Sequence, residues 1–212
     1  MDEDIEIINQ NTRKLLIKNF FKKNYKKILF LFSLLIFILV FFFSFQEVQD
    51  RKKNKLAEKF NNIIFDKSLT NQGYMKSQMI EIVNAKDSTY SILALYFLIE
   101  NKLLDNEIEI NKLFDLIISI SKKEDKKLII FKKALYNSDK LTDNEILSIL
   151  QPIINSESIW KQHALLLMAD VYFNTKQFNK SREFLNKILD LEISNQKIKM
   201  DVQKRLNRDF SE

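Results

Sequence analysis

Residues 28–45 read ILFLFSLLIFILVFFFSF, a run without a charged residue or a proline. Sixteen of its eighteen residues are Leu, Ile, Val or Phe, and the other two are serines. A helix rises about 1.5 Å per residue, so this run forms a helix about 27 Å long, enough to cross the hydrocarbon core of a bilayer. The run therefore predicts a single transmembrane anchor near the N-terminus.

Two other interpretations of this run are less favoured. A cleaved signal peptide has a shorter apolar stretch, followed by small residues at the cleavage site. The next residues, Phe45–Asp50, read FQEVQD and contain no such site. A core helix of a soluble protein rarely lacks a polar face over this length. We therefore expect the anchor to remain uncut.

The charges around the run predict its orientation. Seven Lys or Arg residues lie in residues 1–27, and five lie in the twenty residues after the run. Since Lys and Arg favour the cytoplasmic side, this small bias predicts a cytoplasmic N-terminus. The expected parts are a cytoplasmic basic-amphipathic segment (1–27), the anchor (28–45) and a periplasmic helical domain (46–212). The chain would be a single-pass protein of a bacterial inner membrane.

The segment before the anchor combines apolar and basic residues. On a helix, Leu16, Ile17, Phe20 and Phe21 share one face, and Lys14, Lys18, Lys22 and Lys23 surround that face. This pattern is typical of a helix that lies in the headgroup layer of a membrane. The same lysines also serve as an ordinary positive flank that fixes topology. The two interpretations are compatible, and the sequence favours neither.

The composition predicts an all-α fold. The 212 residues include one glycine, Gly73, and one proline, Pro152, whereas all-β and doubly wound folds need turns rich in both. We attribute the abundance of Lys, Asn, Ile and Phe to an AT-rich genome. The absence of cysteine excludes disulfides and thiolate metal sites. Residues 46–212 carry twenty-seven basic and twenty-four acidic residues, and this near balance argues against a nucleic-acid partner.

Apolar residues at helical spacing predict a series of helices joined by short turns. The anchor helix is expected to continue to about Asp66. The expected later helices cover about 75–85, 90–99, 108–118, 126–136 and 142–150, then one that ends near 173, one over 178–191 and one that ends near 207. The expected N-terminal caps are Asp87 or Ser88, Asp105 or Asn106, Thr142, Ser156 or Ser158, and Ser194. Gly73 is expected in a turn or helix cap, and Pro152 is expected to kink or end its helix.

Residues 162–195 resemble a tetratricopeptide repeat. The apolar, small and aromatic positions of the first helix are occupied by Leu165, Met168, Ala169 and Tyr172, and those of the second by Phe178, Ser181 and Leu185. Ile193 replaces the usual terminal proline, and Ile188 replaces a usual alanine. The resemblance implies a solenoid of α-hairpins, with earlier pairs at about 89–121 and 126–155. The alternative is an ordinary helical hairpin in which these residues are core contacts.

The whole chain resembles the YfgM-type family. The chain has an acidic start (residues 1–4), a basic-aromatic segment (15–25), one anchor, a long following helix and a tetratricopeptide-like domain. Tyr25 lies near the position where the family usually has a glycine. Members of this family are single-span inner-membrane proteins that act as ancillary subunits of the SecYEG translocon and in the periplasmic chaperone network. The resemblance implies the same type of partner here.

The sequence offers few groups for catalysis. It has one histidine, His163, and no cysteine, and it has no glycine-rich phosphate-binding motif. We therefore expect no enzyme activity, no metal site and no cofactor. In the tetratricopeptide frame, the first helix of the hairpin lines a partner-binding groove. The residues placed there are His163, Leu166, Asp170, Phe173 and Asn174. The alternative is a packing face covered by the last helix, and Trp160 is expected to fill the joint between hairpins.

Two functions remain open at the level of sequence. The first is a membrane-anchored protein-interaction module, an ancillary translocon subunit or chaperone-network adaptor that binds partner or client polypeptides. The second is a structural scaffold for envelope assembly or cell division. The sequence does not determine whether the chain forms homo-oligomers. The Phe-rich anchor has no small-xxx-small pattern, so it does not suggest a tight transmembrane dimer.

Overall fold

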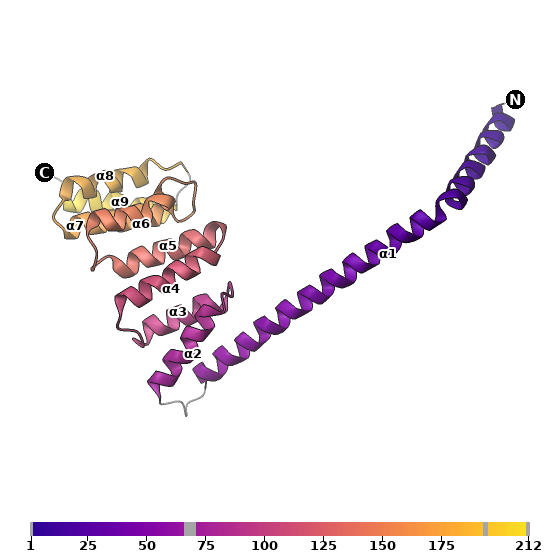
Figure 1. The fold of residues 1–212 in the computed structure, drawn as a ribbon. Helices are drawn as coiled ribbons and strands as arrows, with labels where there is room; N and C mark the ends of the chain where they lie inside the picture. The colour runs from indigo at the N-terminus through magenta and orange to yellow at the C-terminus, as the bar shows by residue number, and fades with distance from the viewer. Residues whose placement is uncertain (1, 66–70, 193–194, 211–212) are drawn as a thin grey trace. The chain divides into compact units, whose positions relative to one another are not determined.

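The computed structural model describes the backbone of residues 2–65, 71–192 and 195–210, and side chains from Arg13 onward. Within those ranges there are nine α-helices and no strand, which confirms the prediction of an all-α protein (Figure 1). The chain divides into two compact units, Met1–Lys55 and Leu56–Glu212. We describe each unit by itself.

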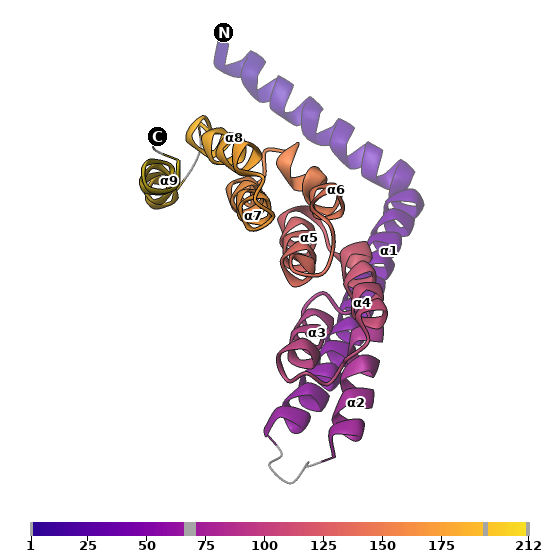
Figure 2. The same cartoon turned by 90° about the vertical axis from the view of Figure 1, so that its left-hand side faces the viewer.

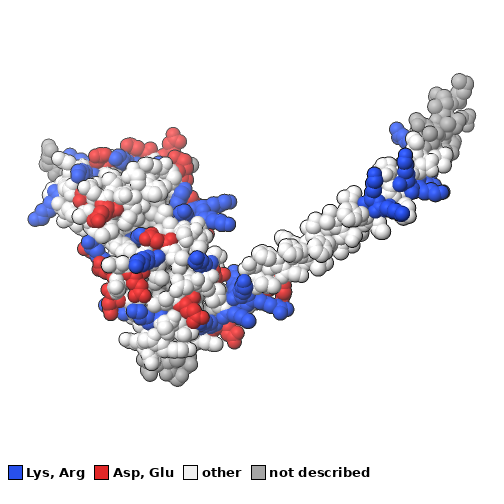
Figure 3. Space-filling model, in the orientation of Figure 1, with Lys and Arg blue, Asp and Glu red and all other residues white. Residues whose placement is uncertain are grey.

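The first unit consists of most of one long helix, α1 (Asp2–Phe65). As predicted, the anchor continues as a helix almost to Asp66. α1 is long and apolar enough to cross a membrane, and none of its most apolar window is buried by protein. A core helix would be covered by neighbours, so the absence of buried side chains in this window contradicts that interpretation. In Figure 3 this part of α1 is an uncharged white stretch with blue side chains on both sides.

The second unit contains the end of α1 and all later helices. Their bounds are α2 (Gln72–Asn84), α3 (Tyr90–Glu100), α4 (Glu107–Ile120), α5 (Lys123–Asn137), α6 (Asp143–Ile154), α7 (Lys161–Asn174), α8 (Phe178–Leu189) and α9 (Gln196–Asp209). From α2 onward each helix packs against the next one in sequence, as the successive layers of Figure 2 show. Contacts also join α2 to α4 and α5 to α7. The arrangement is therefore built from neighbours in sequence.

Two apolar clusters form the core of this unit. One cluster joins Phe60 and Ile63 of α1 to buried residues of α2, α3 and α4. The other joins Ile130 and Ala134 of α5 to buried residues of α6, α7 and α8, and it includes Val202 of α9. Burial of apolar area, at about 25 cal/mol per Å², is the main force that holds such helices together.

Polar caps define where several helices begin. Asn106 Oδ1 accepts hydrogen bonds from the amides of Ile108 (2.9 Å) and Glu109 (3.2 Å), so the predicted cap is confirmed. The capping box is also confirmed, since the Thr142 amide donates to Glu145 Oε2 at 2.9 Å and the Glu145 amide donates to Thr142 Oγ1 at 3.4 Å. These bonds satisfy amides that have no partner inside the helix.

Some sequence predictions of boundaries were wrong. Gly73 lies in the first turn of α2, and the cap before it is Asn71, whose side chain accepts from the Tyr74 amide. Pro152 lies inside α6, which ends two residues later at Ile154. The α5 helix begins at Lys123, three residues before the expected start. The predicted cap Ser194 lies outside the described residues, and Asn195 caps α9.

The turns between helices use lysine where proteins usually use glycine. Positive φ angles occur at Lys86 (58°), Lys102 (50°) and Lys176 (62°), each just after a helix end. After α7, the Gln177 amide donates to the Tyr172 carbonyl at 2.8 Å and the Lys176 amide to the Phe173 carbonyl at 3.0 Å, the two bonds of a Schellman motif. A left-handed conformation is unfavourable for a residue with a Cβ. The chain therefore retains conformational strain at these turns.

We expect Lys176→Gly to stabilise the helical unit by about 0.5–1 kcal/mol. The left-handed conformation costs a non-glycine residue about 1–2 kcal/mol, which exceeds the extra backbone entropy that glycine loses, about 0.5–1 kcal/mol. The control is Lys132→Gly in the interior of α5, which should destabilise by about 1 kcal/mol. Urea unfolding of the detergent-solubilised chain, followed by the fluorescence of its only tryptophan, measures both. A lower free energy of unfolding in Lys176→Gly would contradict the inference that the backbone is strained at Lys176.

Candidate functional site

The five predicted groove residues all lie on α7, but their surroundings differ along the helix. Asp170 forms an ion pair with Arg205 of α9. The Phe173 ring packs against Phe178, with ring centroids 5.3 Å apart, and against Phe210, at 6.0 Å. Toward its C-terminal end, this face of α7 is therefore in contact with α9 and the residue that follows it, which is the arrangement of the alternative interpretation.

The other predicted residues are not covered by α9 in this way. Asn174 is exposed, and Leu166 is half-buried against the core cluster of α6–α8. The His163 ring contacts Trp160 and Phe131, with centroids 5.5 Å and 6.1 Å away. Trp160 also stacks on Phe131 of α5, with an interplanar angle of 20°, so it fills a joint between helices as expected.

A hollow of about 690 Å³ lies at the N-terminal end of α7. One wall is residues 157–163, and the other is residues 190–192 together with Asn195. The Ile159 side chain is 71% exposed, while Trp160 and Leu191 are half-buried. Of the predicted groove residues, only His163 lines this hollow. The buried His163 Nδ1 has no hydrogen-bond partner within the described part of the chain.

A glutamate on α5 holds the first wall in place. Glu124 Oε2 accepts hydrogen bonds from Ser158 Oγ at 2.7 Å and from the Ile159 amide at 3.2 Å. Ser158 Oγ in turn accepts from the Trp160 amide at 3.1 Å. The prediction that Ser156 or Ser158 caps this helix was wrong, because α7 begins at Lys161 and its N-cap residue is Trp160, whose side chain makes no cap bond. The Ser158 hydroxyl, together with the Lys127 ammonium, holds the pKa of Glu124 below its ordinary value. The backbone that carries Ile159 is thus fixed by a carboxylate 35 residues earlier in the sequence.

Two sets of hydrogen bonds hold the second wall. The Asn195 amide donates to Gln162 Oε1 at 2.9 Å, and Gln162 Nε2 donates to the Asn195 carbonyl at 3.4 Å. Lys199 Nζ donates to the carbonyls of Leu189 (2.7 Å) and Leu191 (2.6 Å). A lysine ammonium satisfies carbonyls at a helix C-terminus, where the helix dipole is negative. Both walls therefore have defined backbone positions.

The residues that line the hollow include both carboxylates and apolar side chains. The carboxylates are those of Glu157, Asp190 and Glu192, and the one cation is Lys161, whose Nζ lies 3.9 Å from Glu157 Oε1. The apolar surface comes from Ile159, Trp160 and Leu191. A hollow lined in this way suits a polypeptide ligand in which an apolar side chain has lysine or arginine neighbours.

The described residues contain no group of three or more His, Asp or Glu side chains close enough to hold a metal ion. The hollow has one histidine beside aromatic rings, with no serine, cysteine or lysine nucleophile bonded to it.

Sequence reasoning found one wall of this hollow and missed the other. His163 was identified from helix periodicity. Ser158 was identified from capping preferences, although the N-cap residue of α7 is Trp160. Asp190 and Glu192 were missed because they follow α8, which the apolar pattern extended to residue 191, whereas it ends at Leu189. The role of Glu124 in this wall had no local signal, since Ser158 and Ile159 are more than thirty residues away in the sequence.

Comparisons with protein-family models, with curated proteins and with solved structures found no match.

We expect Glu124→Gln to loosen the segment before α7. The pKa of Glu124 is lowered in the folded protein, so its ionised carboxylate stabilises the fold. This stabilisation is fully present above the ordinary glutamate pKa, and it is lost as the pH falls through the lowered pKa. The amide proton resonance of Ile159 should therefore titrate with Glu124 in the native chain, and it should not titrate in the variant. Hydrogen exchange at the same amide should be faster in the variant at neutral pH.

The matched control is Glu157→Gln, which alters a fully exposed carboxylate on the same segment. It should leave the Ile159 amide unchanged. Equal effects of the two substitutions would show that general charge loss, rather than the Glu124 bonds, explains the result.

Proposed function

We propose that this chain is a membrane-anchored protein-interaction module whose helical unit binds polypeptides at the hollow beside Trp160. The observation that carries the proposal is an exposed isoleucine in a hollow that is also lined by three carboxylates, on a helical unit preceded by a helix apolar enough to cross a membrane. The ligand is an unfolded or extended segment with an apolar residue next to lysine or arginine. The apolar residue would contact Ile159 and Trp160, and its basic neighbours would pair with the carboxylates that line the hollow.

Membrane anchoring and polypeptide binding reinforce each other. An uncut anchor confines the helical unit to the membrane surface, which raises its effective concentration for chains that emerge there. A hollow of modest size gives weak, reversible binding, which suits an adaptor that receives and releases clients. The proposed location is a bacterial inner membrane with the helical unit in the periplasm. The proposed partners are a SecYEG-type translocon, periplasmic chaperones or their client polypeptides.

Packing between α7 and α8 supports the tetratricopeptide-like interpretation. Ser181 Oγ donates to the Ala169 carbonyl at 2.8 Å, so the two small residues allow the close approach that this repeat requires. The remaining apolar positions of the repeat, apart from Phe178, are buried: Leu165, Met168, Tyr172, Leu185 and Ile188. We propose that α2–α9 form a tetratricopeptide-like solenoid, and that the hollow is its binding site at the last complete hairpin.

A photo-crosslinking amino acid at Ile159 tests the binding proposal in living cells. We expect it to form adducts with translocon components, chaperones or client chains. The matched control is Ile108 on α4, an isoleucine of similar exposure (68%, compared with 71% for Ile159) outside the hollow. Ile108 should give few adducts. Equal, diffuse labelling from both positions would count against a specific site, and adducts only with a second copy of the chain would favour a scaffold.

Cysteine labelling tests the orientation. The chain has no cysteine, so Ser119→Cys introduces a single exposed thiol on α4. A membrane-impermeant maleimide should modify this thiol in intact spheroplasts, because we place the helical unit in the periplasm. The mass of the labelled chain should include residues 1–27 and the anchor. Labelling only after lysis would reverse the orientation, and loss of the anchor from the mature chain would identify a signal peptide.

A further inference from the structure

Residues 13–27 carry seven basic residues and no acidic residue. Four of them, Lys14, Lys18, Lys22 and Lys26, are spaced by four. Because residues four apart are neighbours on a helix surface, these lysines form one continuous row along α1. We refer to these four residues as the lysine ridge.

The lysine ridge has no acidic partner in the part of the chain that the structure describes. None of its four lysines forms an ion pair there, whereas Arg51, on the other side of the apolar run, pairs with Glu47 at 2.7 Å. Like charges at this spacing destabilise a helix in water. A negatively charged surface beside the ridge would remove this repulsion.

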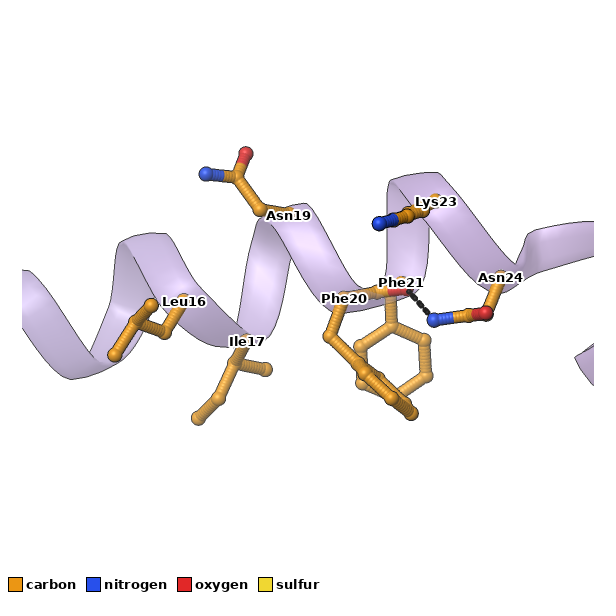
Figure 4. A pocket seen from close by; sticks show the side chains of 7 residues that line it. All are labelled: Leu16, Ile17, Asn19, Phe20, Phe21, Lys23 and Asn24. Carbon is orange, nitrogen blue, oxygen red and sulfur yellow. Dashed lines mark hydrogen bonds between the residues drawn. The ribbon is translucent and has the colours of Figure 1, made fainter.

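The apolar face of the same segment is exposed. Leu16, Ile17, Phe20 and Phe21 are 54–64% exposed. Figure 4 shows these four side chains on one side of the helix, with Asn19 on the other side. The rings of Phe20 and Phe21 contact each other edge to face, with centroids 6.1 Å apart. A helix with such a face and a basic ridge binds stably where an apolar layer lies next to a layer of negative charge.

A bend separates this segment from the apolar run. Figures 1 and 2 show α1 bending within its indigo N-terminal part. The half-buried Asn24 donates from Nδ2 to the Phe20 carbonyl at 3.0 Å. Polar side chains that bond to the preceding turn often bend a helix. The bend gives the segment before it a different direction from the run that follows.

We infer that residues 13–27 bind anionic lipid headgroups and lie along the membrane surface. In this arrangement Leu16, Ile17, Phe20 and Phe21 enter the boundary with the acyl chains, and the lysine ridge contacts lipid phosphates. The segment adjoins the apolar run directly, since Lys27 precedes Ile28, so a membrane crossed by α1 places headgroups beside it. This inference rests on the membrane anchor of the proposed function but does not need polypeptide binding. An experiment can therefore refute lipid binding and polypeptide binding independently.

The experiment uses the full chain in lipid nanodiscs, in which both membrane faces are accessible. The native chain has no cysteine, so a spin label attaches only at an introduced one. Labels are placed at Phe20→Cys on the apolar face and at Asn19→Cys on the opposite side. Collision rates with oxygen and with a water-soluble nickel complex then report depth. Ile36→Cys, within the run, should report the acyl layer in every sample and verifies insertion of the anchor.

With about one-third phosphatidylglycerol in phosphatidylcholine, position 20 should be shielded from the nickel complex and position 19 should not. Changing all four ridge lysines to glutamine should increase nickel collisions at position 20 toward those at position 19. The membrane-bound state should weaken by about fivefold per lysine. Changing the same four to arginine should preserve the shielding. The matched control, glutamine at Arg51, Lys52, Lys53 and Lys55, removes the same charge elsewhere on α1 and should have no effect.

Three outcomes would overturn the inference. Equal nickel access at positions 19 and 20 would show that the segment does not lie on the membrane. Equal shielding in pure phosphatidylcholine, unchanged by high salt, would show that anionic headgroups are not recognised. Shielding that appears only after a protein or nucleic-acid fraction is added would identify a different partner.

Discussion

The apolar residues of α1 set the main physical constraint on this molecule. Between Ile28 and Phe45, the large apolar side chains described as exposed range from 45% at Leu34 to 70% at Leu29. Transfer of such a run from water into a bilayer is favourable by an amount on the order of 5 to 10 kcal/mol. A helix is suited to that transfer because all its internal backbone groups are already bonded. In the proposed arrangement, with the anchor uncut, the rest of the chain functions at a membrane surface.

The sequence predicted the helices well and their ends less well. Apolar periodicity identified every helix because the buried face of each one repeats at helical spacing, as in α4 with Ile110, Leu113, Phe114 and Ile117. The usual signal for a helix end is a glycine in the left-handed conformation. Here lysine occupies that conformation at Lys86, Lys102 and Lys176, so this signal was missing. A lysine-rich, glycine-poor composition therefore hides turn positions that the fold nevertheless requires.

The candidate site was only partly predictable for a related reason. The tetratricopeptide frame placed five residues on one face of α7, and periodicity was sufficient for that. It left open whether the last helix covers this face. It could not identify Arg205 and Phe210, more than thirty residues later, as the residues that contact it at Asp170 and Phe173. The hollow beside Trp160 depends on Glu124 and Gln162, whose bonds reach across 33 to 35 residues. Contacts of this kind follow from packing and leave no local pattern in the sequence.

The segments before and after the apolar run carry the same net charge, but their lysines have different surroundings. Residues 1–27 and residues 46–212 each have three more basic than acidic residues. In the helical unit, lysines pair with carboxylates of other helices, as Lys133 does with Asp115 at 2.7 Å and Lys59 with Glu81 at 2.6 Å. The acidic residues of the N-terminal end all lie within its first six positions, far from the lysine ridge.

Net charge is therefore a poor guide to the partners of this protein, whereas the position of each charge is informative. A lysine that pairs within the fold contributes little attraction to an external anion, since its field is largely cancelled nearby. Four lysines in one row, with no carboxylate within reach along the helix, retain their full attraction for an external surface. This difference in charge placement is consistent with the two proposals: polypeptide ligands for the helical unit, and anionic lipid for residues 13–27.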